Sequence, residues 1–251
     1  MQNKVEEAKK ILLGNRKNGY TLPTNNKLYP AQWNWDSAFI ALGYSYFNLD
    51  FSITEIETLL NGQWDDGMVP HILFHEKDTS YFPNHTTWQC GKNIPSSGIT
   101  QPPVLASILR KIVEKNQLSN EQHSRIVNII KKIKNYHDWF IKFRDPNKTG
   151  LVSILHPWES GYDNSPIWDQ PMSNIKVDKD LNYKRRDLEV SNSDERPLKT
   201  DYDRYVTLRD QFRNVQYDPH KLYEISAVSY THLRAHEPKA NLVCRLLLEK
   251  K

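Results

Sequence analysis

The sequence predicts an all-α fold, and three observations support this prediction. Six segments place apolar residues at helical spacing and carry helix-boundary signals. Strand signals are sparse, because only residues 68–74 and 151–155 form short apolar pieces, which are either brief strands or loop anchors. No alternation of strands and helices appears along the chain, which argues against an α/β fold.

The first three helices are expected over residues 3–13, 36–47 and 52–61. The second of them begins at Asp36, a residue type favoured at the N-cap. The first and third are indicated by apolar residues that recur on one face of a helix. These residues are Val5, Ala8, Ile11 and Leu12 in the first segment and Ile53, Ile56, Leu59 and Leu60 in the third.

Three more helices are expected over residues 102–116, 119–143 and 200–214. The first of these opens with two prolines, which a first helical turn tolerates. The segment 119–143 starts with Ser119 and carries Gln122 three residues later, the spacing of a capping box. The last starts at a threonine with an aspartate three residues on, which is another cap signal.

The loops between these helices are long and rich in Trp, Pro, Gly, Asp and His. Loops longer than about 12–15 residues are usually functional or disordered, and these are too aromatic to be disordered. Six helices occupy the first 225 residues, whereas a closed ring of paired helices needs about twice as many. The alternatives are a compact six-helix domain with large loops or a part of something larger, and we expect the second.

The helical residue pattern of the sequence ends abruptly near residue 226, so we divide the chain into 1–225 and 226–251. The second segment resembles translated adapter-derived ends seen on proteins inferred from metagenomic assemblies, and we interpret it as a non-native tail. An ordinary C-terminal helix over 240–250 is the alternative. This tail holds five Lys and Arg against two acids, or +3 of the net charge of +4, so the body carries only 4 − 3 = +1. Since no basic stripe stands in the body, we expect no nucleic-acid partner.

The cysteine count and the N-terminus restrict the class of protein further. Two cysteines, Cys90 and Cys244, provide neither a disulfide framework nor a metal cluster. The first thirteen residues are charged and contain no apolar stretch long enough for a signal peptide or a membrane span. We therefore expect a soluble, cytoplasmic protein with no membrane partner, no metal and no cofactor, and the oligomeric state stays open.

The first candidate site segment runs from Tyr29 to Asp36 and contains Trp33 and Trp35. Sugars present apolar C–H faces that stack on indole rings, and their hydroxyls suit a carboxylate acceptor. Seven Trp in 251 residues allow for such plates. The alternative is a tryptophan wedge between helices, with Asp36 as a plain N-cap.

Two further segments carry weaker signals. Asp65, Asp66 and Gly67 are most simply a turn, and His71 among apolar residues is more often a hydrogen-bonded structural histidine than a catalyst. Tyr81 follows in a Pro- and His-bearing loop. Before the segment 102–116, the side-chain amide of Gln101 is able to donate to and accept from a hydroxyl, and Thr100 is the alternative as a helix cap.

The segment 156–169 concentrates three acids, two Trp and two Pro in fourteen residues. Glycoside hydrolysis needs one acid to protonate the leaving oxygen and a second carboxylate across the bond. A tryptophan surround raises a carboxyl pKa and keeps the acid protonated. Glu159 and Asp163 both qualify by composition, and the alternative is a loop folded on its own hydrogen bonds. Serine-hydrolase, metalloprotease and phosphate-loop motifs do not occur in the chain.

Taken together, four motifs resemble the glycoside hydrolase family that holds processing α-glucosidase, and most closely its bacterial mannosylglycerate and glucosylglycerate hydrolases. The resemblance covers residues 1 to about 225. It rests on their order and spacing, since each alone is weak. The motifs are Tyr29 with Trp33-Asn-Trp-Asp36, Gly67-Met-Val-Pro-His71, Gly98-Ile-Thr-Gln101-Pro-Pro and Trp158-Glu-Ser-Gly-Tyr-Asp163-Asn-Ser-Pro.

The resemblance implies an (α/α)6 barrel, of which residues 1–225 form the N-terminal part, and an inverting α-glycosidase acting on a small, anionic glycoside. Asp163 matches the family's general acid, with Glu159 as a neighbour. The other matched positions fall into two groups. Tyr29, Trp33, Trp35, Asp36, Gln101 and Gly161 match the sugar subsite with Trp158 as a wall, and Tyr81, Arg196 and Tyr202 match the glycerate end.

The family's general base is a Glu beyond the point where this sequence diverges, and no residue here takes its place. Inverting hydrolysis needs two carboxyl groups about 6.5–9.5 Å apart with a water between them. We therefore expect the 251-residue chain to have negligible hydrolase activity. A non-catalytic sugar-binding helical protein and an α/α-barrel lyase or epimerase are the other functions that the sequence allows.

Overall fold

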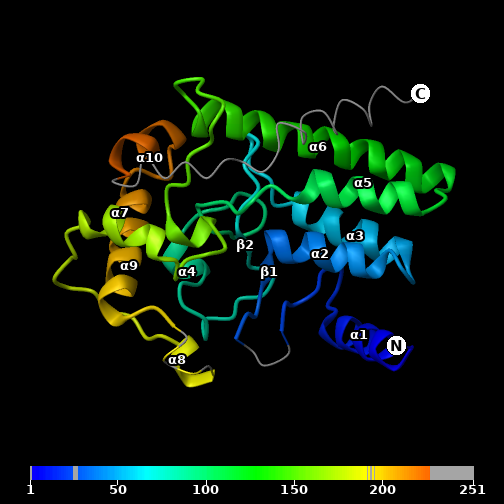
Figure 1. Ribbon diagram of the computed structural model, residues 1–251, viewed down its shortest axis with the longest axis horizontal. Helices are drawn as coiled ribbons and strands as arrows, with labels where there is room; N and C mark the ends of the chain where they lie inside the picture. The colour runs from blue at the N-terminus through cyan, green and yellow to red at the C-terminus, as the bar shows by residue number, and fades with distance from the viewer. Residues whose placement is uncertain (1, 25–27, 191, 193, 195, 227–251) are drawn as a thin grey trace.

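The computed structural model describes residues 2–24, 28–190, 192, 194 and 196–226, and this part of the chain is mostly helical (Figure 1). The predicted all-α class is therefore confirmed. The elements in chain order are α1 (Gln2–Asn15), β1 (Gln32–Trp33), α2 (Asn34–Tyr44), α3 (Leu49–Leu60), β2 (Ile72–Leu73), α4 (His85–Trp88), α5 (Leu105–Lys115), α6 (Asn120–Arg144), η1 (Pro157–Glu159), η2 (Pro166–Trp168), α7 (Asp169–Ser173), α8 (Asp187–Val190), α9 (Lys199–Asn214) and α10 (Pro219–Ile225).

All six helices predicted from periodicity are present as α1, α2, α3, α5, α6 and α9, but several begin elsewhere than expected. The prediction that Asp36 is the N-cap of α2 is wrong, because Trp33 occupies the cap and Asp36 lies in the first turn. The threonine expected to start α9 is also not its cap, since Leu198 holds that position without a side-chain hydrogen bond. Helix α2 starts two residues earlier than predicted and α9 one residue earlier.

The start signals of α5 and α6 have opposite outcomes. The two prolines before α5 lie outside the helix, which begins at Leu105, so the prediction that they form its first turn is wrong. The capping box of α6 is confirmed. The Ser119 hydroxyl accepts from the Gln122 N–H at 3.2 Å, and the Gln122 side chain accepts from the Ser119 N–H at 3.1 Å. Local side-chain chemistry therefore determines where α6 begins.

Four helices, α2, α3, α5 and α6, lie side by side and form the first hydrophobic cluster of the molecule (Figure 1). Their apolar stripes meet in the interior, as helical periodicity predicts. Burying one such aliphatic side chain contributes about 1.5–3 kcal/mol relative to leaving it exposed. Fully buried members include Ile53, Ile56, Leu59, Ile112 and Ile133.

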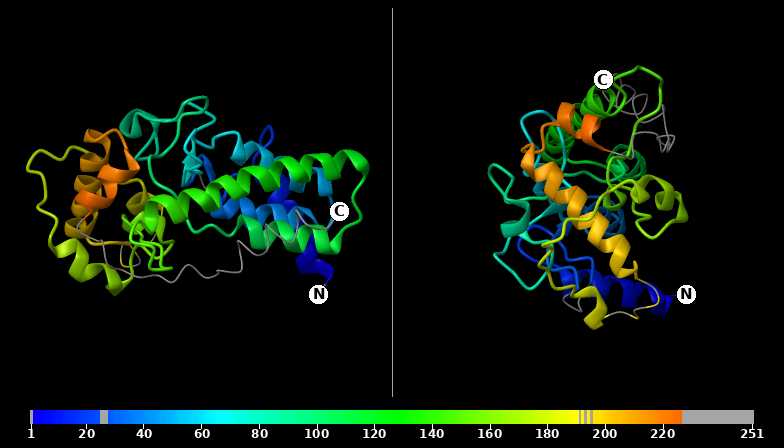
Figure 2. Two further views of the ribbon diagram at one scale, coloured as in Figure 1. Left: turned by 90° about the horizontal axis from the view of Figure 1, so that it is seen from above. Right: turned by 90° about the vertical axis from the view of Figure 1, so that its left-hand side faces the viewer.

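The second cluster is more aromatic and combines side chains of α4, α7, α9 and α10 with those of β1 and β2. Helices α9 and α10, coloured yellow to orange, lie at one end of the molecule (Figure 2). Trp88 and Trp168 are fully buried in this cluster, and the Tyr217 hydroxyl donates to the Trp88 carbonyl oxygen at 2.7 Å. α4, α7, α8 and α10 had no sequence signal, because each spans fewer than eight residues. The two clusters are held together by loops and by β1 and β2.

The strands are short. β1 pairs with β2 in an antiparallel manner, with Gln32 opposite Leu73 and Trp33 opposite Ile72. Successive side chains of a strand point to opposite faces. Gln32 therefore reaches the interior, where its amide donates to Glu55 at 3.1 Å, while Trp33 faces away from that interior contact. Residues 151–155 form no strand, and serve as a loop anchor through the Ser153 N–H, which donates to the Arg144 carbonyl at 2.7 Å.

Helix α1 is present as predicted, but most of its apolar face is exposed. Val5 and Ile11 are 52% and 61% exposed, and only Leu12 of the predicted stripe is half-buried, beside Gly43. Among the described residues, no helix combines the length and the apolar character that crossing a membrane requires. The tail predicted to be non-native lies outside the described residues except for residue 226, and so does the alternative helix over 240–250.

Candidate active site

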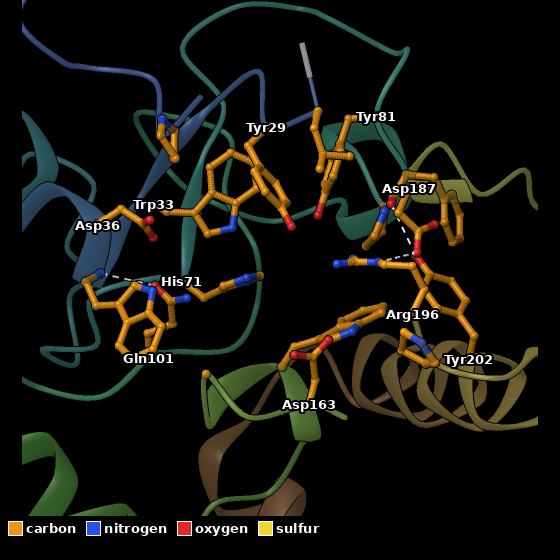
Figure 3. Close-up of a pocket in the computed structure, with 18 residues that line it drawn as sticks. Tyr29, Trp33, Asp36, His71, Tyr81, Gln101, Asp163, Asp187, Arg196 and Tyr202 are labelled. Carbon is orange, nitrogen blue, oxygen red and sulfur yellow. Dashed lines mark hydrogen bonds and ion pairs between the residues drawn. The ribbon is translucent and has the colours of Figure 1, made fainter. Parts of the chain in front are cut away.

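One cavity of about 280 Å³ is lined by all eleven residues that the sequence nominated for the site (Figure 3). This volume is near the lower end of the range for small-molecule sites, about 300–1,000 Å³. The residues come from five separate stretches of the chain, so only the fold brings them together. They are Tyr29, Trp33, Trp35, Asp36, Tyr81, Gln101, Trp158, Gly161, Asp163, Arg196 and Tyr202.

The first wall of the cavity is the start of α2. Asn34 fixes this point, because its backbone N–H donates to the His71 carbonyl at 3.0 Å and its side chain donates to the Tyr136 hydroxyl at 3.2 Å. Trp33 precedes Asn34 and Trp35 follows it, so both indoles border the cavity. The tryptophan wedge considered from the sequence is partly correct for Trp33, which is buried, and less so for Trp35, which is half-buried.

Gln101 connects a distant segment to this wall. Its side-chain oxygen accepts from the Trp35 backbone N–H at 3.1 Å, so it satisfies one of the open donors at the N-terminus of α2. Gln101 therefore caps α2 from outside the helix and leaves its amide nitrogen at the cavity. Thr100 does not cap α5, since its hydroxyl donates to the Val69 carbonyl at 2.7 Å.

Asp36 lies in the first turn of α2 and is half-buried at the cavity. Burial raises the pKa of its carboxyl group to about 6, and hydrogen bonds to the backbone and to Trp35 act in the opposite direction. At neutral pH the group is mainly ionised. An ionised carboxylate at this position is an acceptor for two donors, such as neighbouring hydroxyls.

Gly161 lies under the ring of Trp35. A Cβ atom at this glycine would stand 2.3 Å from the Trp35 Cη2 atom, which no packing allows. Its φ of +68° also belongs to the left-handed region that favours glycine. The backbone here approaches the indole so closely that Gly161 determines where the ring lies.

Glu159 and Asp163, equally eligible by composition, have different environments. Glu159 is buried and accepts from the guanidinium of Arg144 at 2.6 and 3.2 Å. It also accepts from the backbone N–H groups of Thr100 at 3.2 Å and Leu155 at 2.9 Å. Four donors thus hold its two oxygens in place, and Glu159 does not line the cavity. Glu159 is therefore a structural anchor.

Asp163 lines the cavity and is half-buried. Burial is the largest influence on its carboxyl group and raises the pKa, while its own backbone and Arg196 act to lower it. Its backbone carbonyl accepts from the Tyr205 hydroxyl at 2.6 Å, which fixes the loop at this residue. A carboxyl group whose pKa is raised by burial at a cavity has the environment of a general acid.

The loop around Asp163 is also folded on its own hydrogen bonds, as the alternative interpretation expected. The Ser160 hydroxyl donates to the Pro157 carbonyl at 2.6 Å, and the Trp168 indole donates to the Tyr162 carbonyl at 3.0 Å. Trp158 packs with its edge toward Tyr202, with ring centroids 5.8 Å apart. The internal bonds make the loop rigid and do not remove Asp163 from the cavity.

The opposite end of the cavity combines hydroxyl-bearing rings with a cation. Tyr81 stands edge-on to Trp33 at 5.5 Å and 6.4 Å from the ring of Tyr29. Burial raises the pKa of Tyr81 well above its usual range, so its hydroxyl stays neutral and donates or accepts. Arg196 extends its guanidinium into the space between these rings and Asp163 (Figure 3).

Two polar residues at the cavity were missed or underrated from the sequence. Asp187 had no motif around it, and its only signal is an acid two residues after Arg185. His71 was expected to be a hydrogen-bonded structural histidine. Its backbone is hydrogen-bonded, but its ring borders the cavity, and its Nδ1 atom has no hydrogen-bond partner among the described residues. Burial lowers the pKa of His71 to about 3, so the ring is neutral.

His71, His75 and His85 lie near each other in sequence but do not form a cluster in the structure. The ring of His75 stacks on Tyr20 with centroids 4.2 Å apart, whereas His85 lies beside Phe74. In the described part of the chain, no group of three or more His, Cys, Asp or Glu side chains is arranged to hold a metal ion. The cavity therefore offers acid–base, stacking and ion-pairing groups.

The comparison with family models matches residues 29–237 to the mannosylglycerate hydrolase MGH1-like glycoside hydrolase domain. A mannosylglycerate hydrolase of Thermus thermophilus is 44% identical over 223 residues, which are 88% of this chain and 54% of that protein. A glucosylglycerate hydrolase of Mycolicibacterium hassiacum is 34% identical over 208 residues, covering 78% of this chain and 47% of its own length. The chain thus spans about half the length of the curated relatives that it matches.

Solved structures agree with this similarity. The crystal structure of a mannosylglycerate hydrolase from Thermus thermophilus in complex with Tris and D-glycerate superposes with a TM-score of 0.89 at 41% identity. The match covers 96% of this chain and 58% of that chain. It confirms the predicted α/α-barrel type of fold for the portion that the chain represents.

Proposed function

Because the chain belongs to the mannosylglycerate hydrolase MGH1-like glycoside hydrolase family, we propose that it forms the general-acid side of an inverting α-glycosidase. Its substrate is a small α-glycoside with an anionic aglycone, such as glucosylglycerate or mannosylglycerate. The observation that carries the proposal is the cavity itself, which combines a half-buried carboxyl group of raised pKa, indole plates and a guanidinium.

In this proposal Asp163 is the general acid. It protonates the glycosidic oxygen while the C–O bond breaks, so that the aglycone leaves as a neutral alcohol group. A water then adds to the anomeric carbon from the opposite face of the sugar, and its proton passes to a second carboxylate. The raised pKa of Asp163 keeps the proton available at the start of this step.

The sugar is placed in the part of the cavity formed by Trp33, Trp35 and Trp158, with Gly161 admitting the close approach of one ring. Aromatic faces stack on the C–H faces of a pyranose, and the ionised Asp36 accepts from its hydroxyls. Gln101 adds an amide donor. At the other end, Tyr81, Tyr202 and Arg196 bind the carboxylate and hydroxyl of the aglycone, since a guanidinium binds a carboxylate through two hydrogen bonds.

The general base is proposed to come from outside the described residues. Asp36, Asp163 and Asp187 are the carboxyl groups among the described residues that line the cavity. Asp187 is a poor base, because Arg185 and Arg196 donate to its two oxygens and hold its pKa below the usual range against the effect of burial. Asp36 sits beside the two indoles of the sugar end. General acid–base groups contribute typically about 10²–10⁴-fold to the rate, so the 251-residue chain is expected to be nearly inactive.

A direct test measures binding and turnover by the same chain. Titration with glucosylglycerate and mannosylglycerate, followed through tryptophan fluorescence, should show saturable binding. Proton NMR of the mixtures should show negligible hydrolysis. Rapid turnover by the 251-residue chain would contradict the proposed origin of the base, and absence of binding would contradict the proposed site.

The acid role of Asp163 is tested in a fusion that continues residues 1–225 with the corresponding C-terminal half of the Thermus thermophilus relative. NMR should show the inverted anomer as the first product of this fusion. Asp163→Asn should abolish turnover and leave substrate binding intact. Unchanged turnover would remove Asp163 from the acid role, whereas binding without turnover in every fusion would favour the sugar-binding alternative.

A further inference from the structure

Arg196 lines the cavity, and the groups around its long side chain determine where its guanidinium lies. It follows α8 and precedes α9, and its side chain is 24% exposed. A long arginine side chain in a loop samples many rotamers unless its neighbours restrict it, and each restriction costs conformational entropy. The groups that hold Arg196 therefore decide whether it acts as a rigid receptor or as a mobile surface charge.

Asp187 holds the side chain of Arg196. The Nε–H of Arg196 donates to the Oδ2 atom of Asp187 at 3.0 Å. The acceptor is itself 9% exposed and lines the cavity next to the guanidinium it holds (Figure 3). Because the bond uses Nε, the two terminal amino groups of Arg196 remain on the side that faces the cavity.

Arg185 holds both Asp187 and the backbone beside Arg196. It donates from Nε to Oδ1 of Asp187 at 3.1 Å and from Nη2 to Oδ2 at 2.6 Å. Its Nη1 donates to the Pro197 carbonyl at 2.8 Å, so it fixes the chain directly after Arg196. The guanidinium of Arg185 also lies 4.2 Å from the ring centroid of Tyr202. Each nitrogen of Arg185 has a partner within the protein, and little of its charge is left for a ligand.

The charges of the three residues do not cancel. Two arginines and one carboxylate sum to 2 − 1 = +1, and the carboxylate is engaged in a two-bond pair with Arg185. The remaining positive charge is carried by Arg196, the member of the group that extends into the cavity. We propose that Asp187 is a positioning residue that makes Arg196 a directed receptor for a carboxylate, and that Arg185 neutralises Asp187 so that this receptor stays cationic. This inference rests on the proposed function, because it explains how the site selects an anionic aglycone over a neutral one.

A simple charge field predicts the opposite effect of removing Asp187. Asp187→Asn raises the charge of the group from +1 to +2, and a field alone would strengthen the binding of an anion. If position matters more than charge, the same substitution releases Arg196 and weakens binding of the anion. The two explanations differ in sign, so one variant separates them.

The experiment uses the 251-residue chain and two probes that share the sugar, glucosylglycerate and the uncharged glucosylglycerol. NMR titration should show that the unsubstituted chain prefers the anionic glycoside. In Asp187→Asn the affinity for glucosylglycerate should fall by about tenfold, the loss expected when one charge-assisted interaction is no longer aligned. The affinity for glucosylglycerol should stay within about twofold, because the sugar end is unchanged, and circular dichroism should match the parent chain.

Asp210→Asn is the matched control. Asp210 also pairs with two arginines, Arg209 at 3.2 Å and Arg213 at 2.8 Å, but it does not line the cavity. Its substitution should leave both affinities unchanged. An equal loss in this control would show that breaking any Arg–Asp pair of the protein weakens binding, and would overturn the positioning role.

A second variant keeps the inference falsifiable if Asp187→Asn fails to fold. Arg185→Gln leaves Asp187 paired with Arg196 alone, so the charges of that pair cancel and the preference for the anion should again be lost. An anion preference that is retained or increased in either variant overturns the inference and leaves the proposed function intact. If the unsubstituted chain binds neither probe, the proposed function fails and the inference fails with it.

Discussion

At the scale of single residues, the role of each carboxyl group depends on what surrounds it. Glu159 accepts four hydrogen bonds and is buried against Arg144, whereas Asp163, four residues later, is half-buried with a raised pKa. Burial raises the pKa of Asp36 to about 6, whereas two arginines hold the pKa of Asp187 below its usual range. Carboxyl groups thus serve as a structural anchor, the proposed acid, a proposed acceptor and a partner that holds Arg196.

Gly161 provides a test at this scale. Gly161→Ala places a methyl group 2.3 Å from Trp35 at a φ of +68°, so the indole has to move. We expect a loss of roughly 1–3 kcal/mol in the free energy of unfolding. Sugar binding should also weaken by about tenfold or more, since one stacking surface is displaced. Urea unfolding and tryptophan fluorescence titration measure the two effects.

Gly150 is the matched control for this substitution. Its φ is +79°, but a Cβ atom there meets nothing within 4 Å. Gly150→Ala should therefore show only the cost of the left-handed backbone, about 1–2 kcal/mol, with sugar binding unchanged. If Gly161→Ala bound sugar as well as this control does, Trp35 would not belong to the binding surface.

Asp36 predicts a dependence of binding on pH. Its ionised form accepts from sugar hydroxyls more strongly than its protonated form, so affinity should rise as pH increases through about 6. The effect on stability has the opposite sign. The folded-state pKa lies above the reference value of 3.8, so the folded protein binds more protons between these values. The free energy of unfolding should therefore decrease as pH rises from 3.8 to about 6.

Titrations of a neutral glycoside between pH 5 and pH 8 check the binding prediction. Asp36→Asn should bind more weakly and lose the inflection near the pKa of the parent residue. An inflection that persists in the asparagine variant would assign it to another group, such as Asp163, whose pKa is also raised by burial.

At the scale of elements, the start of α2 shows how a distant segment completes a helix. Trp33 occupies the N-cap but offers no side-chain acceptor, so the first backbone donors need partners from elsewhere. Gln101 supplies one from the segment before α5, 66 residues away in sequence. The same contact places the Gln101 amide beside the indoles, so helix capping and the lining of the cavity are coupled.

Removing this tertiary cap should affect stability and binding together. Gln101→Ala is expected to cost about 0.5–2 kcal/mol in the free energy of unfolding, the usual range for a lost cap. Sugar affinity should fall as well, because the start of α2 carries Trp35 and Asp36. Chemical denaturation and ligand titration measure both quantities.

Ser119→Ala provides the comparison, because Ser119 caps α6 in an exposed region and does not line the cavity. It should cost a similar amount of stability, about 0.5–2 kcal/mol, without changing sugar affinity. Equal losses of affinity in the two variants would mean that Gln101 acts through global stability alone.

At the scale of the whole molecule, the aliphatic cluster of α2, α3, α5 and α6 is joined to the aromatic cluster around α4, α9 and α10. Arg144 at the end of α6 and Glu159 in η1 form a buried ion pair at 2.6 Å, with side chains only 1% and 3% exposed. The loop that carries this glutamate also carries Asp163. The pair therefore fixes the acid-bearing loop to the helical layer.

Breaking this pair on one side should be costly. Arg144→Met leaves Glu159 buried without its cation, and we expect a loss of about 3–5 kcal/mol in the free energy of unfolding. Replacing both residues with Met and Leu should recover much of this loss, because the buried charge is then removed. Lys92→Met, which removes an exposed partner of Asp65, should have little effect in the same urea titrations. A small effect of Arg144→Met would show that the backbone N–H groups of Thr100 and Leu155 are sufficient to hold the buried Glu159 carboxylate.

The sequence by itself determined the class of fold and the identity of the nominated residues. Helical periodicity is a local property, so the six long helices were predictable, and the capping box of Ser119 and Gln122 located the start of α6 to the residue. The motifs around Trp33, Gln101 and Asp163 were readable because their residue types are unusual in loops. The short helices were not predictable, since segments of four to seven residues have too little periodicity to be recognised.

Only the tertiary structure decided which carboxyl groups line the cavity and which partners surround each of them. Glu159 and Asp163 have the same chemistry in the sequence, and burial together with four donors separates them. Asp187 had only a weak sequence signal, its position two residues after Arg185, because its role depends on contacts with both Arg185 and Arg196 in space. Helix α2 begins at Asn34 and not at the predicted Asp36, because the Gln101 side chain accepts from a backbone N–H of its first turn. Burial and partners are set by residues far apart in the chain, and local sequence patterns do not contain that information.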